Sequence, residues 1–431
     1  MDNVFFTYTP EGWEKATYLR LGSVMMESTH STREREDKRI SVFCLITALT
    51  GGGAEMVLYR LMARLDRSKF NPQVVSMIDL GPVSEKIRDL GIAVRSLGMS
   101  QGMPNPLAVI KLVRWLQCDK PDVIQTWMYH ADLLGGLAAR LAGGIPVSWG
   151  IRHSDLSVEG NRRLTLLTVQ ACAPLSRWLP TKIVCCSEAS REAHAAVGYA
   201  TEKMIVIPNG VDHELFRPNP NARATIRQNL GIPDDTPIIG MVGRFDPQKD
   251  HYNFIQAARR LYRFLPGARF LLCGEEVTWE NAELVKWIED AGIRERCFLL
   301  GKRDDIPDLM TAFDIATLSS MGEGFPNVVI EAMACGVPCV VTDVGESARI
   351  VAETGKVVPR RDPRTLADAW HAMLKLDRTT RAQLGLAARR RVMEEYSLSQ
   401  IVSRYESLFE ELACKSISQE RPSSRRAYVR D

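Results

Sequence analysis

Residues 322–336 read GEGFPNVVIEAMACG, and the fold expected for the whole chain follows from this stretch. Its first glycines favour a tight loop, and Pro326 favours the first turn of a helix, where a missing N–H costs nothing. We predict a strand over residues 315–320 before the loop and a helix over residues 327–334 after it. The free N–H groups and the positive dipole end of that helix would form an anion site.

Two carboxylates, Glu323 and Glu331, flank the predicted helix start, eight positions apart. Acids beside an anion site are expected when the anion also carries hydroxyl groups, as a sugar joined to a diphosphate and a ribose does. Surface glutamates at an ordinary turn between a strand and a helix are the alternative. The pair alone leaves both interpretations open.

The chain from residue 40 onward alternates near-continuous apolar strands with amphipathic helices. This pattern predicts parallel sheets that are covered by helices on both faces. Residues 216–237 contain four prolines and are predicted to connect two such series. Three helices are predicted to end the chain, over residues 365–375, 378–395 and 398–412.

The charge balance argues against a nucleic-acid-binding protein, because the 431 residues carry a net charge of only +3. The charge is uneven: residues 39–210 hold 19 basic and 13 acidic residues, whereas residues 211–431 hold 31 and 32. A mildly basic first half fits an anionic membrane surface or a phosphorylated acceptor. An ordinary solvated surface explains it equally well.

Ten cysteines are scattered without a C-x-x-C pair, which indicates buried thiols in a reducing compartment rather than disulfides or a zinc site. Neither a membrane-spanning stretch of about 18 apolar residues nor a signal peptide is recognisable. We therefore expect a cytoplasmic protein. Residues 162–179 are apolar with basic ends, so this stretch is either a helix in a membrane interface or a buried helix.

A second polar loop, residues 243–250 with the sequence GRFDPQKD, follows a predicted strand over residues 237–243. Arg244 offers a fork of donors and Lys249 a point charge, at the edge of the sheet where doubly wound folds bind ligands. Asp250 is predicted to cap the next helix.

The spacing of Glu323 and Glu331, together with the G-R-x-x-x-x-K pattern of residues 243–249, resembles the donor site of the family 4 glycosyltransferases, group 1 type. The resemblance implies a retaining enzyme with the GT-B fold. That fold is α/β, with two Rossmann-like, doubly wound domains facing across a cleft and a C-terminal helix that crosses back to the first domain. The implied division is a mobile N-terminal extension (1–38), an acceptor domain (39–215), a nucleotide-sugar donor domain (216–396), the returning helix (397–413) and a polar tail (414–431).

The resemblance also implies roles for single residues. Arg244 and Lys249 would hold the donor diphosphate and stabilise it as it leaves, so neither a metal nor a cofactor is expected. Glu331 would bind the ribose hydroxyls, and Glu323 the sugar hydroxyls. The implied catalytic residues are Arg244, Lys249, Glu323 and His153. The implied substrate-binding residues are Glu331, Gly52, Gly53, Phe325, Pro326, Asn327, Val328 and Arg303.

Two histidines compete for the place facing the donor sugar. His153 follows a predicted strand over residues 146–151, where the family often has a histidine, and we prefer it. His130 begins a predicted helix and is the second candidate, on the acceptor side.

Two further loops give weaker indications of a ligand-binding role. The three glycines at 51–53 would let the backbone approach the donor diphosphate, although a structural turn explains them equally. Arg303 would mark the loop that contacts the base, and a structural role is equally open. The family commonly has G-x-G after the strand before this loop, whereas this chain has Glu275 and Glu276 after Gly274, which leaves base recognition open.

The resemblance implies transfer of a sugar from a nucleotide-diphosphate sugar, preferably a UDP-sugar, to a hydroxyl of a glycan or lipid-linked acceptor. The process would be surface polysaccharide or glycoconjugate biosynthesis, with peripheral contact to the inner membrane surface as an option. The alternatives are a nucleotide-sugar 2-epimerase of the same fold and a non-catalytic nucleotide-sugar-binding homologue. Interconversion of free nucleotide sugar without an acceptor would indicate the epimerase.

Overall fold

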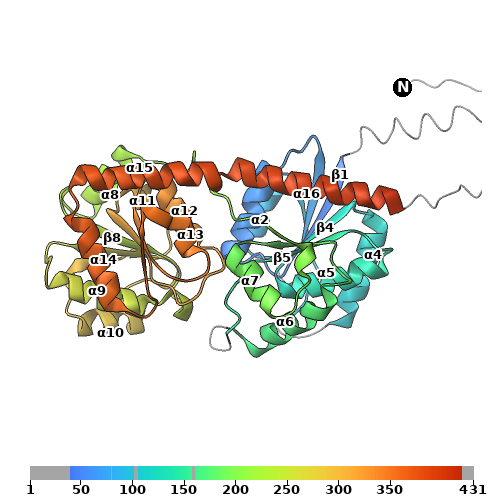
Figure 1. Cartoon of the computed structure of the whole chain (residues 1–431), viewed down its shortest axis with the longest axis horizontal. Helices are drawn as coiled ribbons and strands as arrows, with labels where there is room; N and C mark the ends of the chain where they lie inside the picture. Colours follow the sequence, from blue (N-terminus) through green and yellow to red (C-terminus); the bar gives the residue numbers. More distant parts are fainter. Residues whose placement is uncertain (1–38, 79, 101–104, 158–160, 420–431) are drawn as a thin grey trace, which may run out of the picture. The chain divides into compact units, whose positions relative to one another are not determined.

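The computed structural model describes residues 39–78, 80–100, 105–157 and 161–419. The predicted mobile extension and the end of the predicted polar tail lie outside the described residues. From Ile40 onward the described residues belong to one compact unit, which contains two parallel β-sheets (Figure 1).

The first sheet has seven described strands, all parallel, in the order β3-β2-β1-β4-β5-β6-β7. They are β1 (Ile40–Ile46), β2 (Phe70–Ser76), β3 (Ala93–Ser96), β4 (Val123–Trp127), β5 (Val147–Ile151), β6 (Lys182–Cys185) and β7 (Met204–Val206). The strand interiors are apolar and buried on both faces, as expected for a parallel sheet between layers of helices.

Two separate apolar cores cover the two faces of this sheet. One core is formed with α2 (Gly53–Arg64), α3 (Pro82–Asp89) and α16 (Leu398–Gln419). The other is formed with α4 (Pro106–Asp119), α5 (Tyr129–Leu141) and α6 (Arg163–Leu175). A further helix, α7 (Glu188–Ala196), contacts β6 and β7 near the sheet edge.

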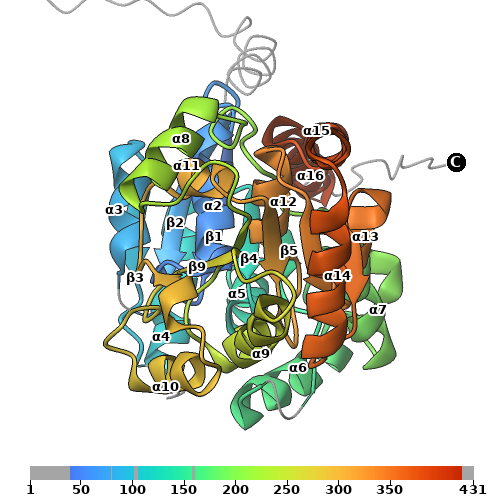
Figure 2. The same cartoon turned by 90° about the vertical axis from the view of Figure 1, so that its left-hand side faces the viewer.

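The second sheet has six described strands, also parallel, in the order β10-β9-β8-β11-β12-β13. They are β8 (Ile238–Val242), β9 (Arg269–Cys273), β10 (Cys297–Leu299), β11 (Ile315–Leu318), β12 (Cys339–Thr342) and β13 (Lys356–Val358). One face packs on α8 (Pro220–Asn229), α11 (Ile306–Thr311), α12 (Asn327–Ala334), α13 (Ser347–Val351) and α15 (Arg378–Glu395). The other packs on α9 (His251–Tyr262), α10 (Ala282–Asp290) and α14 (Pro363–Lys375), which Figure 2 shows toward the viewer.

Both sheets have the doubly wound strand order, and the predicted fold class is confirmed. In each sheet the order reverses beside the first strand: between β1 and β4 in one, and between β8 and β11 in the other. Ligands of doubly wound sheets bind outside the carboxyl ends of the strands at such a reversal. The glycine loop follows β1, the Arg244 loop follows β8 and the Glu323 loop follows β11.

The last helix packs on the first sheet, so the predicted return of the C-terminal helix is confirmed. Tyr405 of α16 stacks on Trp127 of β4 with ring centroids 6.1 Å apart, and Phe409 meets Phe70 of β2 edge to face at 6.1 Å. Figure 1 shows α16 alongside α2 and β1. The helix runs to Gln419, beyond the predicted end at residue 412.

Residues 216–237, predicted to connect the two βα series, lie between β7 and β8 and contain a helix that the sequence analysis did not predict, α8. Asn219 caps this helix by accepting from the N–H of Ala222 at 3.1 Å, and Pro220 occupies its first position. Proline is favoured there, so Pro220, which was counted only as one of four prolines in a connection, is a helix start signal. The helix is held to the second domain by Arg227, which is buried and donates to the carboxylate of Asp314 at 2.6 Å.

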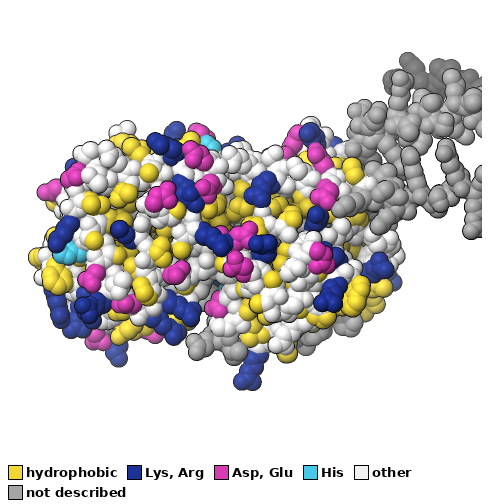
Figure 3. Space-filling model, viewed as in Figure 1, with side chains coloured by type: hydrophobic (Ala, Val, Ile, Leu, Met, Phe, Trp, Pro, Cys, Tyr) yellow, Lys and Arg dark blue, Asp and Glu magenta, His cyan; other side chains and the backbone are white. Residues whose placement is uncertain are grey.

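Acidic and basic side chains are interspersed over the described part of the face drawn in Figure 3. Within the described part of the chain, no helix combines the length and the apolar character that crossing a lipid bilayer requires.

Candidate functional site

The loop between β11 and α12 holds Glu323 in a hydrogen-bond network. Its Oε1 atom accepts from Nζ of Lys249 at 2.5 Å and from Oγ of Ser320 at 2.7 Å. The backbone below is fixed as well, because Oγ1 of Thr342 donates to the Ser320 carbonyl oxygen at 2.7 Å. Only 12% of the Glu323 side chain is exposed, so its pair with Lys249 is short and largely removed from water.

The start of α12 lies directly after this loop. The helix begins at Asn327, and Pro326 precedes it rather than occupying the first turn where we predicted it. No described side chain caps this N-terminus, which leaves its first N–H groups for a ligand. Glu331 lies about one turn inside the helix and is buried. The helix start therefore combines N–H donors that no described side chain caps with a carboxylate on each side.

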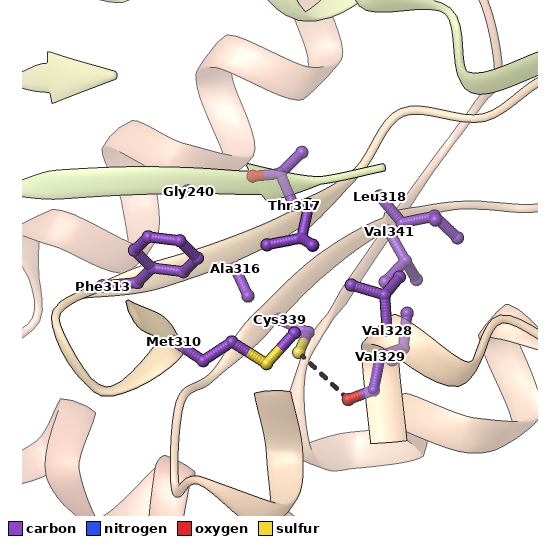
Figure 4. Close-up of a pocket in the computed structure, with 11 residues that line it drawn as sticks. Gly240, Met310, Phe313, Ala316, Thr317, Leu318, Val328, Val329, Cys339 and Val341 are labelled. Atoms are coloured by element: carbon purple, nitrogen blue, oxygen red, sulfur yellow. Dashed lines mark hydrogen bonds between the residues drawn. The ribbon is translucent and has the colours of Figure 1, made fainter. Parts of the chain in front are cut away.

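A small apolar cavity of about 10 Å³ lies beneath α12. In Figure 4, Val328 and Val329 face residues of the neighbouring strands, and Sγ of Cys339 lies 3.9 Å from the carbonyl oxygen of Val329. A space of this size holds about one water molecule at most. It belongs to the packing that fixes the helix start and is not a substrate site.

Lys249 reaches Glu323 from the loop after β8. This loop is tied to the end of β11, because Oγ of Ser319 donates to the Lys249 carbonyl oxygen at 2.9 Å. The predicted cap of the following helix is confirmed: the Asp250 side chain accepts from the N–H of Asn253 at 3.1 Å. Two neighbouring strands at the reversal thus bring the cation and the carboxylate together.

Arg244 lies in the same loop, with 50% of its side chain exposed. Its Nε and Nη2 atoms donate to Oδ2 of Asp246 at 3.1 and 2.9 Å. The guanidinium is held by its own loop and is open enough to turn toward an incoming anion.

The glycine loop after β1 faces α12. A Cβ atom placed on Gly53 would lie 3.5 Å from Nδ2 of Asn327, and one placed on Gly52 would lie 2.6 Å from Oε2 of Glu55. Burial raises the pKa of Glu55. A side chain at Gly52 would displace this carboxylate, so the loop keeps its bare backbone toward the helix start.

His153 lies beside the Glu323 loop. A Cβ atom on Gly324 would stand 2.9 Å from Cα of His153, and Oγ of Ser154 donates to the carbonyl oxygen of Glu323 at 2.5 Å. Burial lowers the pKa of His153, against the opposing effect of Asp155 and Glu323, so the imidazole is neutral at neutral pH.

His130 lies elsewhere, against α6, where its Nε2 atom is 3.4 Å from Oγ1 of Thr168. Burial lowers the pKa of His130 as well. The structure thus brings His153 rather than His130 to the backbone of Glu323.

Sequence reasoning missed Arg60. This residue of α2 donates from Nη2 to Oε1 of Glu331 at 2.5 Å, and only 15% and 11% of the two side chains are exposed. A second side chain that sequence reasoning missed also contacts α12: Nδ2 of Asn209 donates a hydrogen bond to Oδ1 of Asn327 at 2.8 Å. One signal could have found Arg60: it lies seven positions after Gly53, on the same face of the helix that starts at the glycine loop.

Arg303 lines a cavity of about 620 Å³ together with Arg60 and Glu331. Its Nε atom donates to Oδ1 of Asp305 at 2.7 Å, so its own loop fixes the guanidinium. Its lining includes Glu331 of α12 and residues of the loop after β10, and its volume is large enough for a nucleoside.

The side chain of Phe325 packs into the core of the second sheet. The ring is buried and meets Tyr396 edge to face, with centroids 5.6 Å apart.

The turn after β9 has a structural reason for Gly274, because a Cβ atom there would lie 2.1 Å from the carbonyl oxygen of Gly243. The carbonyl oxygen of the next residue, Glu275, accepts from the N–H of Phe245 at 2.8 Å.

Among the described residues, no group of three or more His, Cys, Asp or Glu side chains is placed to hold a metal ion.

Two family models match the chain in consecutive parts. Residues 51–215 match Glycosyltransferase Family 4, and residues 222–391 match Glycosyl transferases group 1. Together these matches include the glycine loop and every residue of the Glu323 and Lys249 loops.

Individual relatives agree with these matches. The Bacillus subtilis protein EpsF, whose name assigns it provisionally to the glycosyltransferases, is 31% identical over 329 residues, 70% of this chain and 79% of EpsF. The UDP-Gal:alpha-D-GlcNAc-diphosphoundecaprenol alpha-1,3-galactosyltransferase of Escherichia coli is 27% identical over 328 residues, 74% of this chain and 81% of that enzyme. The crystal structure of Anabaena Alr3699/HepE with UDP and glucose has a TM-score of 0.76 and 23% identity, covering 86% of this chain and all of HepE.

Proposed function

Because the chain belongs to the family 4, group 1 glycosyltransferases, we propose that its Lys249–Glu323 cleft transfers a sugar from a UDP-sugar to a lipid-linked or glycan acceptor. The observation that carries the proposal is the meeting of Lys249, Glu323 and the uncapped start of α12 at one sheet edge. A cation and free N–H donors suit a diphosphate, and carboxylates suit hydroxyl groups.

The nucleoside would occupy the cavity of about 620 Å³, with its ribose hydroxyls donating to Glu331 in place of Arg60. The sugar would lie between Glu323 and His153. UDP is the preferred nucleotide because the E. coli relative is named for a UDP-sugar donor and HepE binds UDP.

We propose that the reaction retains the anomeric configuration and needs no metal. The bond between C1 of the sugar and the β-phosphate oxygen breaks, and the acceptor oxygen forms its bond to C1 on the same face. The acceptor proton passes to the departing phosphate oxygen. Lys249 and Arg244 would stabilise the charge that develops on the diphosphate, which is the role a metal ion plays elsewhere. Neutral His153 would donate or accept a hydrogen bond at the sugar without adding charge.

A test mixes the purified protein with UDP-galactose, UDP-glucose or UDP-N-acetylglucosamine and a short-chain diphosphate-linked N-acetylglucosamine. Formation of UDP and a disaccharide product supports the proposal, an α linkage by NMR supports retention, and unchanged rates with EDTA support metal independence. Interconversion of the free nucleotide sugar would support the epimerase alternative instead. UDP binding without transfer to any acceptor would support a non-catalytic homologue.

We further propose that the first domain docks on an anionic membrane through the outer face of α4, α5 and α6. These helices contact one another in sequence and expose large apolar side chains away from the sheet. The exposed residues are Leu107, Ile110, Leu137, Leu141, Leu164, Leu167 and Trp178. Exposed basic residues accompany them, namely Lys111, Arg114, Arg140, Arg162, Arg163 and Arg177. Apolar side chains with a basic fringe suit an interface of anionic lipids.

Co-sedimentation with vesicles tests this docking surface. The protein should pellet with phosphatidylglycerol vesicles and remain free with phosphatidylcholine, and Leu164→Glu with Leu167→Glu should abolish pelleting. Phe264→Glu is the matched control, because Phe264 is an exposed apolar residue of the second domain. Equal binding by all three proteins would contradict the proposal. In that case α6 is an ordinary helix with one buried face.

A further inference from the structure

A second cavity, of about 520 Å³, lies beside the Lys249–Glu323 pair. One wall comes from the segment after β5, with Asp155, Ser157, Asn161 and Arg162. The opposite wall comes from the second domain, with Arg244, Asp246, Arg360 and Arg361 among its residues. This cavity shares none of its lining residues with the one that contains Glu331 and Arg303.

Charge in this cavity is unbalanced toward the cations. Four arginines and two aspartates line it. Asp246 already accepts two hydrogen bonds from Arg244 and one from the backbone N–H of Gln248. The remaining cations make the cavity attractive to an anion with several oxygen atoms, and guanidinium forks match phosphate groups.

The arginines of the second domain are held near the catalytic loop. Nη1 of Arg360 donates to the carbonyl oxygen of Met321 at 3.0 Å, and Nε of Arg361 lies 3.0 Å from its Sδ atom. Met321 precedes Glu323 by two residues, so their Cα atoms are at most about 7.6 Å apart. The two arginines therefore contact a residue of the loop that carries Glu323.

Arg361 adopts a left-handed backbone conformation, with φ of +57°. This region is unfavourable for a residue with a long side chain, and glycine or asparagine is usual there. Backbone strain of this kind is found where a side chain is needed in one position.

We propose that this cavity binds the phosphate groups of a phosphorylated acceptor, with Arg360 and Arg361 as its specificity-determining residues. The proposal rests on the proposed transfer function and adds the acceptor class, an ester of diphosphate. The sugar attached to that diphosphate then reaches across Met321, and its hydroxyl meets C1 of the donor sugar beside Glu323. The relative from E. coli is named for a diphosphate-linked acceptor, which agrees with this chemistry.

The test compares two soluble probes, decyl-diphospho-N-acetylglucosamine and the decyl glycoside of N-acetylglucosamine without phosphate. Calorimetry on protein saturated with UDP measures their binding directly, because UDP occupies the donor diphosphate site. Arg360→Ala and Arg361→Gly should each weaken binding of the diphosphate probe by about 10- to 100-fold. Binding of the phosphate-free probe should stay unchanged.

Arg361→Gly has a second readout. Glycine relieves the left-handed backbone, so this variant should unfold at the same or a higher temperature while it loses affinity for the diphosphate probe. The control is Arg364→Ala, three residues along the chain, whose side chain is 79% exposed and which does not line the cavity.

Three outcomes would overturn the inference. Unchanged affinity for the diphosphate probe in both variants would mean that the cavity is not the phosphate site. Equal weakening for both probes would indicate a structural effect. Loss of binding to phosphatidylglycerol vesicles, with probe binding intact, would assign these arginines to membrane headgroups. Failure of the transfer function itself would appear separately, as absent UDP binding or absent product in the wild-type protein.

Discussion

Arg60 of α2 and Glu331 of α12 lie 271 positions apart in the sequence and form an ion pair, with 2.5 Å between Nη2 of Arg60 and Oε1 of Glu331. The Arg60 Nη1 atom is buried and has no partner in the described structure, and the guanidinium lies 5.8 Å from the ring centroid of Phe216. Because Glu331 is the proposed partner of the ribose, Arg60 and the nucleotide compete for one carboxylate. The pair therefore links the two domains, and nucleotide binding is expected to break it.

A double-mutant cycle tests this competition. Arg60→Met, Glu331→Gln and the double variant should show a coupling of about 1–3 kcal/mol in the free energy of unfolding without nucleotide. With saturating UDP the coupling should fall toward zero, because the ribose replaces Arg60. Urea unfolding followed by both fluorescence and circular dichroism measures it, and coincident transitions validate the two-state treatment. Coupling that UDP leaves intact would place the ribose elsewhere.

Lys249→Met should lower the transfer rate by about 100- to 1000-fold, because the leaving diphosphate loses a preorganised cation. The affinity for UDP should fall less than the rate. Steady-state kinetics with the UDP-sugar, together with UDP calorimetry, separates the two effects. Lys286→Met, on an exposed position of α10, is the control. Transfer at the wild-type rate would rule out the role of Lys249.

Asp132 makes stability depend on pH. It is buried, accepts from Oγ1 of Thr126 at 2.5 Å and from the N–H of Gly150 at 3.1 Å, and burial raises its pKa from 3.8 to about 7. The folded state therefore binds more protons than the unfolded state between pH 4 and 7, so this residue reduces stability as pH rises through that range.

Asp132→Asn should remove that contribution. The variant minus wild-type difference in unfolding free energy should grow between pH 5 and pH 8 by about 2–3 kcal/mol. Burial lowers the pKa values of His194 and His251 to about 4, which makes stability rise with pH. Both proteins contain these histidines, so their contribution cancels in the difference between the two unfolding free energies. A pH-independent difference would mean that Asp132 is ionised throughout.

Gly324→Ala should impair transfer without unfolding the protein. Its Cβ atom would lie 2.4 Å from the carbonyl oxygen of Arg152, where the Glu323 loop meets the segment after β5. The two segments must separate, and displacing reacting groups by about 1 Å lowers rates by about 100-fold. Gly267→Ala is the control, since nothing lies within 4 Å of its Cβ position. Equal rates for both variants would show that the close approach is not needed.

Arg227→Leu should destabilise the second domain by about 3–5 kcal/mol. The guanidinium donates to the carboxylate of Asp314 at 2.6 Å and to several backbone carbonyl oxygens, including that of Ala312 at 2.9 Å. Removing it takes this donor from the carbonyl oxygens of Pro233, Asp234 and Thr236. Asp314 and Ala312 keep hydrogen bonds from Arg223, but the Asp314 carboxylate loses its buried cationic partner. Arg260→Leu, at an exposed position of α9, should change the unfolding free energy by less than about 0.5 kcal/mol. Thermal unfolding of both variants measures the difference.

Local patterns alone predicted several elements well. The helices over residues 327–334 and 378–395 have the predicted limits. The second begins at a recognisable local signal, because the Asp377 side chain caps it by accepting from the N–H of Thr380. The helix α8 was missed because its prolines stand at its start, where they favour a helix, and a proline count cannot tell a start from a break.

The sequence by itself determined that two βα series would form parallel sheets, and that Glu323, Lys249 and the glycine loop would follow strands. Periodicity and loop composition are local properties of the chain, so they can be recognised without knowing which distant residues pack against a segment. Only the tertiary structure decided that Arg60 reaches Glu331, that His153 rather than His130 lies by the Glu323 backbone, and that Arg360 and Arg361 face Arg162 across one cavity. These contacts depend on how two separately formed sheets pack, and residues hundreds of positions apart carry no local signal of meeting.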